Sequence, residues 1–242
     1  MTPPSSPQPP PPDPATIEDT AIGWLTERDD GFTPAREREF AQWLRADPRH
    51  PVAVARLEQA EARKALAASR SALETPFPGA TAGNPNGDVK LVVFFDYACP
   101  YCRQGHADVA KLVREDPKLM VIYRDFPVLS PASTEAAMAS LSAATQEGYR
   151  KFHDAMFDSP GRLSLARTMG IVKGLGLSED KVTADLKNAA LKAEVDKNLV
   201  LGRELGLTGT PSYIIGNRIL SGAVGFDRLK DAVAAARAEK GR

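Results

Sequence analysis

The sequence predicts an α/β domain with a helical subdomain inserted in its middle, preceded by a small all-helical module. Three observations lead to this fold class. Residues 90–126 have the pattern of a strand, a helix and a second strand, residues 130–206 carry almost only helical patterns, and residues 212–238 end the chain with two strands and a helix. A strand, helix and strand in close succession form a βαβ unit, which implies parallel strands.

The first half of the α/β domain has the clearest patterns. A continuous apolar run at 90–96 that ends in a turn indicates a buried strand, and residues 119–126 have the same character. Between them, the apolar side chains of Val109, Leu112 and Val113 fall on one face of a helix expected over 103–115.

The second half returns to strands only near the end of the chain. The strands expected at 212–215 and 218–221 are joined by Gly216-Asn217, which is a two-residue hairpin signal. The element order is therefore βαβ, a helical block, and ββα. This is the order of a thioredoxin fold with an inserted helical subdomain, and we place the domain at 89–242 and the insertion at 130–206.

Two segments without regular structure are expected outside this domain. Residues 1–14 include eight prolines, each of which lacks a backbone donor and fixes φ, so the sequence predicts a disordered tail. Residues 75–88 are rich in Gly, Pro and Asn, which predicts a loop or linker at the domain boundary.

The stretch between them, residues 15–74, has the pattern of three helices. Thr16 resembles the start of a capping box, Thr33-Pro34 opens the second helix with a polar N-cap, and Pro51 starts the third. Both tryptophans of the chain lie here, and a small core can form from four aromatic residues: Trp24, Phe32, Phe40 and Trp43.

Composition and charge exclude several classes of protein. Apolar residues make up 43% of the 242 residues, and the 31 basic residues balance the 31 acidic ones, which gives no electrostatic reason to expect nucleic acid as a partner. The longest strongly apolar run has five residues, so no membrane insertion is expected, and no signal peptide is visible. As the sequence is written, we expect a cytoplasmic protein.

The chain has only two cysteines, Cys99 and Cys102, and their C-x-x-C spacing predicts a redox centre or half of a metal site. The motif follows a predicted strand and opens a predicted helix. Free N–H groups and the helix dipole stabilise a thiolate there, and Pro100 suits the first helical turn. We therefore expect Cys99 to be the exposed nucleophile with a lowered pKa, and Cys102 to be the more buried resolving thiol.

The alternatives to a redox centre are a zinc half-site and an accidental C-x-x-C. A zinc site needs four ligands, but no other cysteine exists, and His50, His106 and His153 do not have metal-ligand spacing with one another. His106 lies one turn beyond Cys102, where it could affect the site electrostatically, but we interpret it as a solvated surface residue. We interpret His153 as a packing residue. Disulfide exchange through a mixed disulfide requires no cofactor, and no metal site is predicted.

A second feature lies far along the chain, where Thr210-Pro211 precedes the strand at 212–215. Cis peptide bonds are nearly confined to X-Pro bonds. A cis bond here would leave the Thr210 backbone free to pair with an extended substrate near Cys99. The alternative is an ordinary loop proline.

Together these strings resemble the DsbA/DsbG-like family of thioredoxin-fold proteins, over roughly residues 83–240. The resemblance rests on residues 92–102, which end in Cys99-Pro100-Tyr101-Cys102, and on residues 209–216, which contain Thr210-Pro211. It implies oxidation or isomerisation of protein thiols, a cis-Pro211 loop beside the cysteines, a redox partner protein, and usually a periplasmic location. The sequence departs from the best-known family oxidant at Val93, where that protein has a buried acid. The nearest acid here is Asp96.

The helical module resembles another family. Its Gly23-Trp24-Leu25, Gly31-Phe32-Thr33 and the run 40–51 are similar to the N-terminal domain of FecR-type anti-sigma regulators. The resemblance implies contact with a sigma factor or a similar partner. Three functions follow from the whole sequence: a protein thiol:disulfide oxidoreductase of unspecified direction, a redox-sensing regulatory protein, and a glutathione-linked thiol transferase.

Overall fold

The computed structural model describes residues 13–240, which fall into two compact units that divide between Lys64 and Ala65. The predicted fold class is confirmed, because a mixed sheet with inserted helices follows an all-helical segment. The domain limits 15–74 and 89–242 stay a prediction, since α3 (Arg49–Glu74) contributes residues to both compact units. Most of the expected proline-rich tail lies outside the described residues.

The first unit is built from α1 (Pro14–Asp30), α2 (Pro34–Ala46) and the first part of α3. Thr33 caps α2 as predicted, because its hydroxyl accepts from the Arg36 N–H at 3.3 Å. The capping box predicted at Thr16 is wrong: α1 already begins at Pro14, whose missing donor costs nothing in the first helical turn.

The predicted aromatic cluster of the first unit is present. The ring of Trp24 lies 5.5 Å from that of Phe40 and 6.3 Å from that of Trp43, and Phe32 completes the group. All four residues are only half-buried. His50, which is buried, stacks on Trp43 with ring centroids 4.1 Å apart, and its Nδ1 lies 2.7 Å from the Trp43 carbonyl oxygen. The motif residues Trp43 and His50 thus have a structural role.

The second unit is organised around a five-stranded sheet, in the described residues, with the order β1-β3-β2-β4-β5. The central strands β2 (Val89–Phe95) and β3 (Leu119–Asp125) are parallel, as the βαβ pattern predicts, and they are joined by α4 (Pro100–Glu115). The strands β4 (Ser212–Ile215) and β5 (Arg218–Ser221) form the predicted hairpin, and β4 pairs antiparallel with β2.

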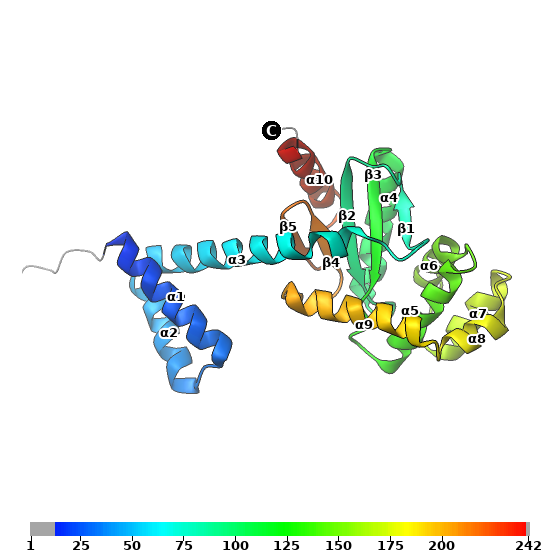
Figure 1. Ribbon diagram of the computed structural model, residues 1–242, viewed down its shortest axis with the longest axis horizontal. Helices are drawn as coiled ribbons and strands as arrows, with labels where there is room; N and C mark the ends of the chain where they lie inside the picture. The colour runs from blue at the N-terminus through cyan, green and yellow to red at the C-terminus, as the bar shows by residue number, and fades with distance from the viewer. Residues whose placement is uncertain (1–12, 241–242) are drawn as a thin grey trace, which may run out of the picture. The chain divides into compact units, whose positions relative to one another are not determined.

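Both faces of the sheet are covered, which explains the continuous apolar runs in β2 and β3. Alternate side chains of a strand point to opposite faces. Leu91, Val93 and Phe95 pack against α4 and α10 (Phe226–Lys240), whereas Val92 and Phe94 pack against α9 and the end of α3 (Figure 1).

The helical insertion lies between β3 and β4. It contains a largely buried helix with four others around it: α5 (Pro131–Ala144), α6 (Tyr149–Asp158), α7 (Leu165–Gly174), α8 (Glu179–Asp185) and α9 (Ala189–Glu204). Among residues 13–240, no helix combines the length and apolar character that crossing a bilayer requires.

The structure differs from the sequence prediction within 75–88, where β1 (Thr81–Gly83) interrupts the expected loop. This strand pairs antiparallel with β3, so that Thr81 stands opposite Ile122. Its three residues have no apolar periodicity of their own, and only the backbone bonds to a distant strand make them a strand.

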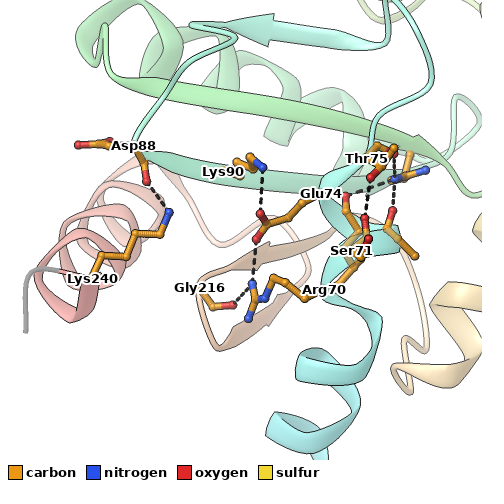
Figure 2. A network of polar contacts seen from close by, with 11 residues as sticks. Arg70, Ser71, Glu74, Thr75, Asp88, Lys90, Gly216 and Lys240 are labelled. Atoms are coloured by element: carbon orange, nitrogen blue, oxygen red, sulfur yellow. Dashed lines mark hydrogen bonds and ion pairs between the residues drawn. The ribbon is translucent and has the colours of Figure 1, made fainter.

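The C-terminal end of α3 belongs to the second unit and makes polar contacts with its sheet. Arg70 donates to the Gly216 carbonyl at 2.9 Å in the β4–β5 turn, and Glu74 accepts from Lys90 of β2 at 3.0 Å (Figure 2). Buried Arg124 of β3 donates to the carbonyl oxygens of Ala72, Leu73 and Thr75, which satisfies acceptors that a helix leaves unpaired at its C-terminus.

Candidate active site

Cys99 lies where the sequence places it, between the end of β2 and the start of α4. It is the N-cap residue of α4, with φ −81° and ψ 120°, and Pro100 takes the first helical position. The Cys99 N–H donates to the Asp96 carbonyl at 3.0 Å, which closes the turn after β2. Cys102 therefore follows within the first turn of the helix.

The surroundings of Cys99 favour its thiolate. A hydrogen bond from the Cys102 side chain contributes most, and the Thr210 side chain and the backbone N–H groups of Cys102 and Tyr101 add to it. Together they lower the pKa of Cys99 to about 5, although burial opposes this. The helix N-terminus supplies the two backbone donors because its first N–H groups have no partner within the helix.

Cys102 has the opposite environment. Its side chain is buried, and its sulfur accepts a long contact of 3.5 Å from the Asp96 N–H. Burial raises the pKa of Cys102 well above the ordinary thiol value, and the neighbouring Cys99 adds to this. At neutral pH the two sulfur atoms thus hold a thiolate and a thiol.

The loop before β4 completes the site. The Thr210–Pro211 peptide bond is cis, as predicted, and the Thr210 carbonyl oxygen lies 3.2 Å from the Cys99 sulfur, where it accepts from the thiol when Cys99 is protonated. This placement follows from the sheet register: Ser212 of β4 stands opposite Phe94 of β2, so the residues before β4 lie at the end of β2 where α4 begins.

Cys99 opens onto a surface groove with a volume of about 540 Å³. Pro100 and Arg103 line it from α4, and Leu129 lines it from the loop after β3. Tyr101 is 62% exposed and Leu129 is 54% exposed. The groove therefore offers apolar side chains and a basic side chain beside the sulfur of Cys99.

One expectation about the cysteines is wrong. Cys99 is not an exposed residue, because 6% of its surface is accessible against 3% for Cys102. What separates the two is the space that each one lines: Cys99 lines the large groove, whereas Cys102 lines a small cavity of about 10 Å³. Loop packing around a sulfur depends on distant residues, so the local pattern could not predict it.

The structure shows what the nearby polar residues Asp96 and His153 do. Asp96 is buried and accepts from the N–H groups of Ala98, Val128 and Leu129 at 2.8–3.0 Å, so it caps two loops. His153 is buried among aromatic rings, as a packing residue should be. Among residues 13–240, no three His, Cys, Asp or Glu side chains are grouped to hold a metal ion.

One residue of the site was not found from the sequence, and another was expected to be solvated. Gly105 of α4 packs so closely on Tyr213 of β4 that a Cβ at Gly105 would lie 2.1 Å from the Tyr213 hydroxyl oxygen. His106 is not the solvated residue expected, because its side chain is only 8% exposed. A glycine in the middle of a predicted helix is the one signal that could have indicated this close contact.

Comparison with known protein families shows which family the α/β domain resembles. The model of the DSBA-like thioredoxin domain matches residues 90–234. The chain belongs to this family. A second model, a domain of unknown function (DUF4880), matches residues 19–60, which is compatible with the likeness of this segment to FecR-type regulators.

Solved structures of DsbA-like proteins share the fold. A thioredoxin-like oxidoreductase from Silicibacter pomeroyi DSS-3 is 37% identical with a TM-score of 0.67, over 69% of this chain and 97% of that one. The thiol-disulfide exchange protein alpha-DsbA2 from Wolbachia pipientis is 29% identical with a TM-score of 0.66, over 73% and 96%. The catalytic domain of Proteus mirabilis ScsC is 28% identical with a TM-score of 0.64, over 73% and 98%. Two of these proteins are named as an oxidoreductase and a thiol-disulfide exchange protein.

Curated relatives include longer proteins. The Na(+)/H(+) antiporter NhaA 1 of Salinispora arenicola is 29% identical over 161 residues, which are 64% of this chain and 24% of that protein. Disulfide bond formation protein D of Bacillus subtilis is 22% identical over 62% of this chain and 73% of its own length. The chain thus spans about a quarter of the antiporter that it matches.

Proposed function

We propose that the chain exchanges disulfides with protein thiols through the Cys99-Pro100-Tyr101-Cys102 dithiol. The observation that carries this proposal is the pairing of a low-pKa sulfur on an open groove with a high-pKa thiol directly behind it. The thiolate is the attacking form of cysteine, and the second thiol releases the product from the mixed disulfide. No cofactor takes part in these steps.

In the reductive direction, the Cys99 sulfur attacks a substrate disulfide, and one substrate sulfur leaves with the electron pair of the broken bond. Cys102 then attacks the Cys99 sulfur of the mixed disulfide, and the second substrate sulfur leaves. Pro100 fixes the start of α4, and Tyr101 offers an exposed ring beside the two cysteines in the sequence. We propose that Thr210 and Pro211 position an extended peptide beside Cys99, since the Thr210 carbonyl already lies at hydrogen-bond distance from that sulfur.

The test is disulfide reduction in insulin by the full chain, with two variants. Cys99→Ser should abolish the reaction, whereas Cys102→Ala should accumulate mixed disulfides with the substrate. Full activity of Cys99→Ser would contradict the proposal. Turnover of a small glutathione mixed disulfide without any reaction on insulin would instead favour a glutathione-linked transferase.

The direction of the reaction is set by the reduction potential of the Cys99–Cys102 pair. A potential of about −120 mV would make the protein an oxidant, and one of about −270 mV a reductant. Equilibration with glutathione buffers of known ratio measures this potential. The location of the protein also affects the direction of the reaction, because a reducing cytoplasm favours reduction of substrate disulfides and an oxidising periplasm favours oxidation of substrate thiols.

For the first unit we propose a role in binding a protein partner such as a sigma factor. Four aromatic rings there stay half-buried, and the DUF4880 match covers the same helices. Trp24 and Trp43 are the only tryptophans of the chain, so their fluorescence reports on this unit alone. Titration with a purified sigma factor should change that fluorescence, and an unchanged spectrum at micromolar concentrations would contradict the proposal.

A further inference from the structure

A small cavity lies beside the side chain of Cys102, and the proton of this thiol must be accepted by some group when the thiol reacts. The cavity measures about 10 Å³, which is close to the space that one water molecule needs. Val93 lines it and carries no group that can accept a proton. Because burial raises the pKa of Cys102, this thiol needs an acceptor when its sulfur attacks the mixed disulfide.

His106 lines the same cavity, one helical turn after Cys102. Its Nε2 lies 3.4 Å from Asp154 Oδ1, and its ring stacks on Phe157 with centroids 5.1 Å apart. Its Nδ1 is buried and has no hydrogen-bond partner within residues 13–240. A buried ring nitrogen without a partner is unusual, because such atoms are normally satisfied by protein or by water.

The other titratable groups of the cavity are already engaged or cannot accept a proton. His153 Nδ1 lies 3.1 Å from the Tyr97 hydroxyl. The Tyr123 hydroxyl accepts from Arg150 at 3.0 Å. Burial raises the pKa of Tyr213, so its phenol stays protonated at neutral pH.

His106 also reaches the outside of the unit. A surface groove of about 360 Å³ lies beyond it, with Arg114, Arg150 and Asp154 among its lining residues. Two side chains, His106 and Phe157, line both this groove and the small cavity beside Cys102. Only the imidazole of His106 can carry a proton from the cavity to the groove.

We propose that His106 accepts the proton of Cys102 through a water molecule in the small cavity and passes it to solvent through the outer groove. This inference rests on the proposed disulfide exchange. The imidazole of His106 on α4 would then accept the proton of the buried thiol. Residue 93 is a valine and offers no carboxyl group for this step.

The step balances as follows. The Cys102 thiol gives its proton by way of the water to His106 Nδ1, and the Cys102 sulfur forms a bond to Cys99. The bond between Cys99 and the substrate breaks, and its electron pair leaves with the substrate sulfur. In the oxidative direction the imidazolium returns the proton to Cys102 as that sulfur leaves.

The charge state of His106 suits an acceptor. Burial lowers the pKa of His106 below its ordinary value, so the ring is neutral at pH 7. The charged and titratable groups that surround it come from α4, α6 and the sheet: Arg103, Arg150, His153, Asp154, Asp158, Tyr123 and Tyr213. Asp154 opposes the shift and stabilises the imidazolium once it forms.

The experiment follows the reaction of the reduced full chain with dithiobis(nitrobenzoate) by rapid mixing. Attack by Cys99 releases a first coloured nitrobenzoate thiolate, and attack by Cys102 releases a second, so the two steps appear as separate phases. We compare His106→Gln, His106→Phe and, as a matched control, Arg114→Gln, which changes the outer groove only.

Both His106 variants should slow the second phase at least about tenfold at pH 7, since a general base contributes about 10²–10⁴-fold. In the unmodified chain the second phase should level off above the pKa of His106. In both variants it should keep rising with pH. Arg114→Gln should leave both phases unchanged.

Three other outcomes would overturn the inference or its basis. His106 would be excluded as the acceptor if the rate of the second phase in His106→Gln stayed within about twofold of the rate in the unmodified chain at every pH from about 5.5 to 8. A normal second phase in His106→Phe alone would show that the ring only packs on Phe157. Absence of both phases in the unmodified chain would contradict the disulfide exchange itself.

Discussion

Cys99 and Cys102 lie one turn apart on the same helix, yet their surroundings differ in every respect that matters for sulfur chemistry. Cys99 is the N-cap residue of α4, where the first helical N–H groups help to lower its pKa, and it lines a large groove. Cys102 lines a small cavity formed largely by aromatic side chains. The contrast shows that the order of reaction of two cysteines is set by their donors and their access, because their residue exposures of 6% and 3% hardly differ.

The largest effect expected from this contrast is unequal alkylation. At pH 6 Cys99 is mostly thiolate while Cys102 stays a thiol, so iodoacetamide should modify Cys99 at least about 100-fold faster. Mass spectrometry of digested protein measures the two rates. In denaturant both cysteines should react alike, and comparable rates in the folded protein would refute the contrast.

A smaller effect is expected where α4 packs on β4. Gly105→Ala would place a Cβ 2.1 Å from the hydroxyl oxygen of buried Tyr213, and overpacking of this kind costs about 1–3 kcal/mol. Urea unfolding of the oxidised protein measures the loss. Gly170→Ala on α7 is the matched control, because nothing lies within 4 Å of its Cβ. This control should be unchanged or more stable by up to about 1 kcal/mol. Equal stability of the two variants would rule out the close contact.

The pH dependence of Cys99 sharpens the comparison further. With a pKa of about 5, its reaction rate should be level above pH 7 and about tenfold lower at pH 4, since only the thiolate reacts. By linkage, the reduced protein gains stability as the pH rises from about 5 toward 9.0, the ordinary thiol value, and loses that gain as the pH falls through 5. The oxidised protein lacks a titrating thiol and should not show this difference. A rate that still rises above pH 8 would contradict the lowered pKa.

The smallest effect concerns one donor to Cys99. Thr210→Val removes the side-chain hydrogen bond but keeps the carbonyl, and it should raise the pKa of Cys99 by up to about one unit. Titration of the thiolate absorbance measures this change. Thr208→Val in the same loop is exposed and should leave the pKa where it is. An equal shift in both variants would assign the effect to the loop and not to the hydroxyl.

Much of the fold was predictable because its signals are local. The apolar runs of β2 and β3 and the Gly216-Asn217 turn each specify their element within a few residues. The site was predictable for the same reason, since Cys99 and Pro100 occupy the N-terminus of a helix that follows a strand.

Other features depend on residues that are distant in the sequence. Arg124 is part of an apolar strand, and only the fold brings the end of α3 onto its guanidinium. β1 becomes a strand only by pairing with β3.

The sequence by itself determined that the first N–H groups of α4 would stabilise a thiolate at Cys99, because Cys99 and these donors belong to the same helix turn. It also determined the order of strands and helices, since hydrophobic periodicity is a property of neighbouring residues. Only the tertiary structure decided what else surrounds each sulfur. The Thr210 side chain and carbonyl, the small cavity behind Cys102 and the burial of His106 arise from chain segments separated by up to about a hundred residues, and their contacts come from packing that no local pattern encodes.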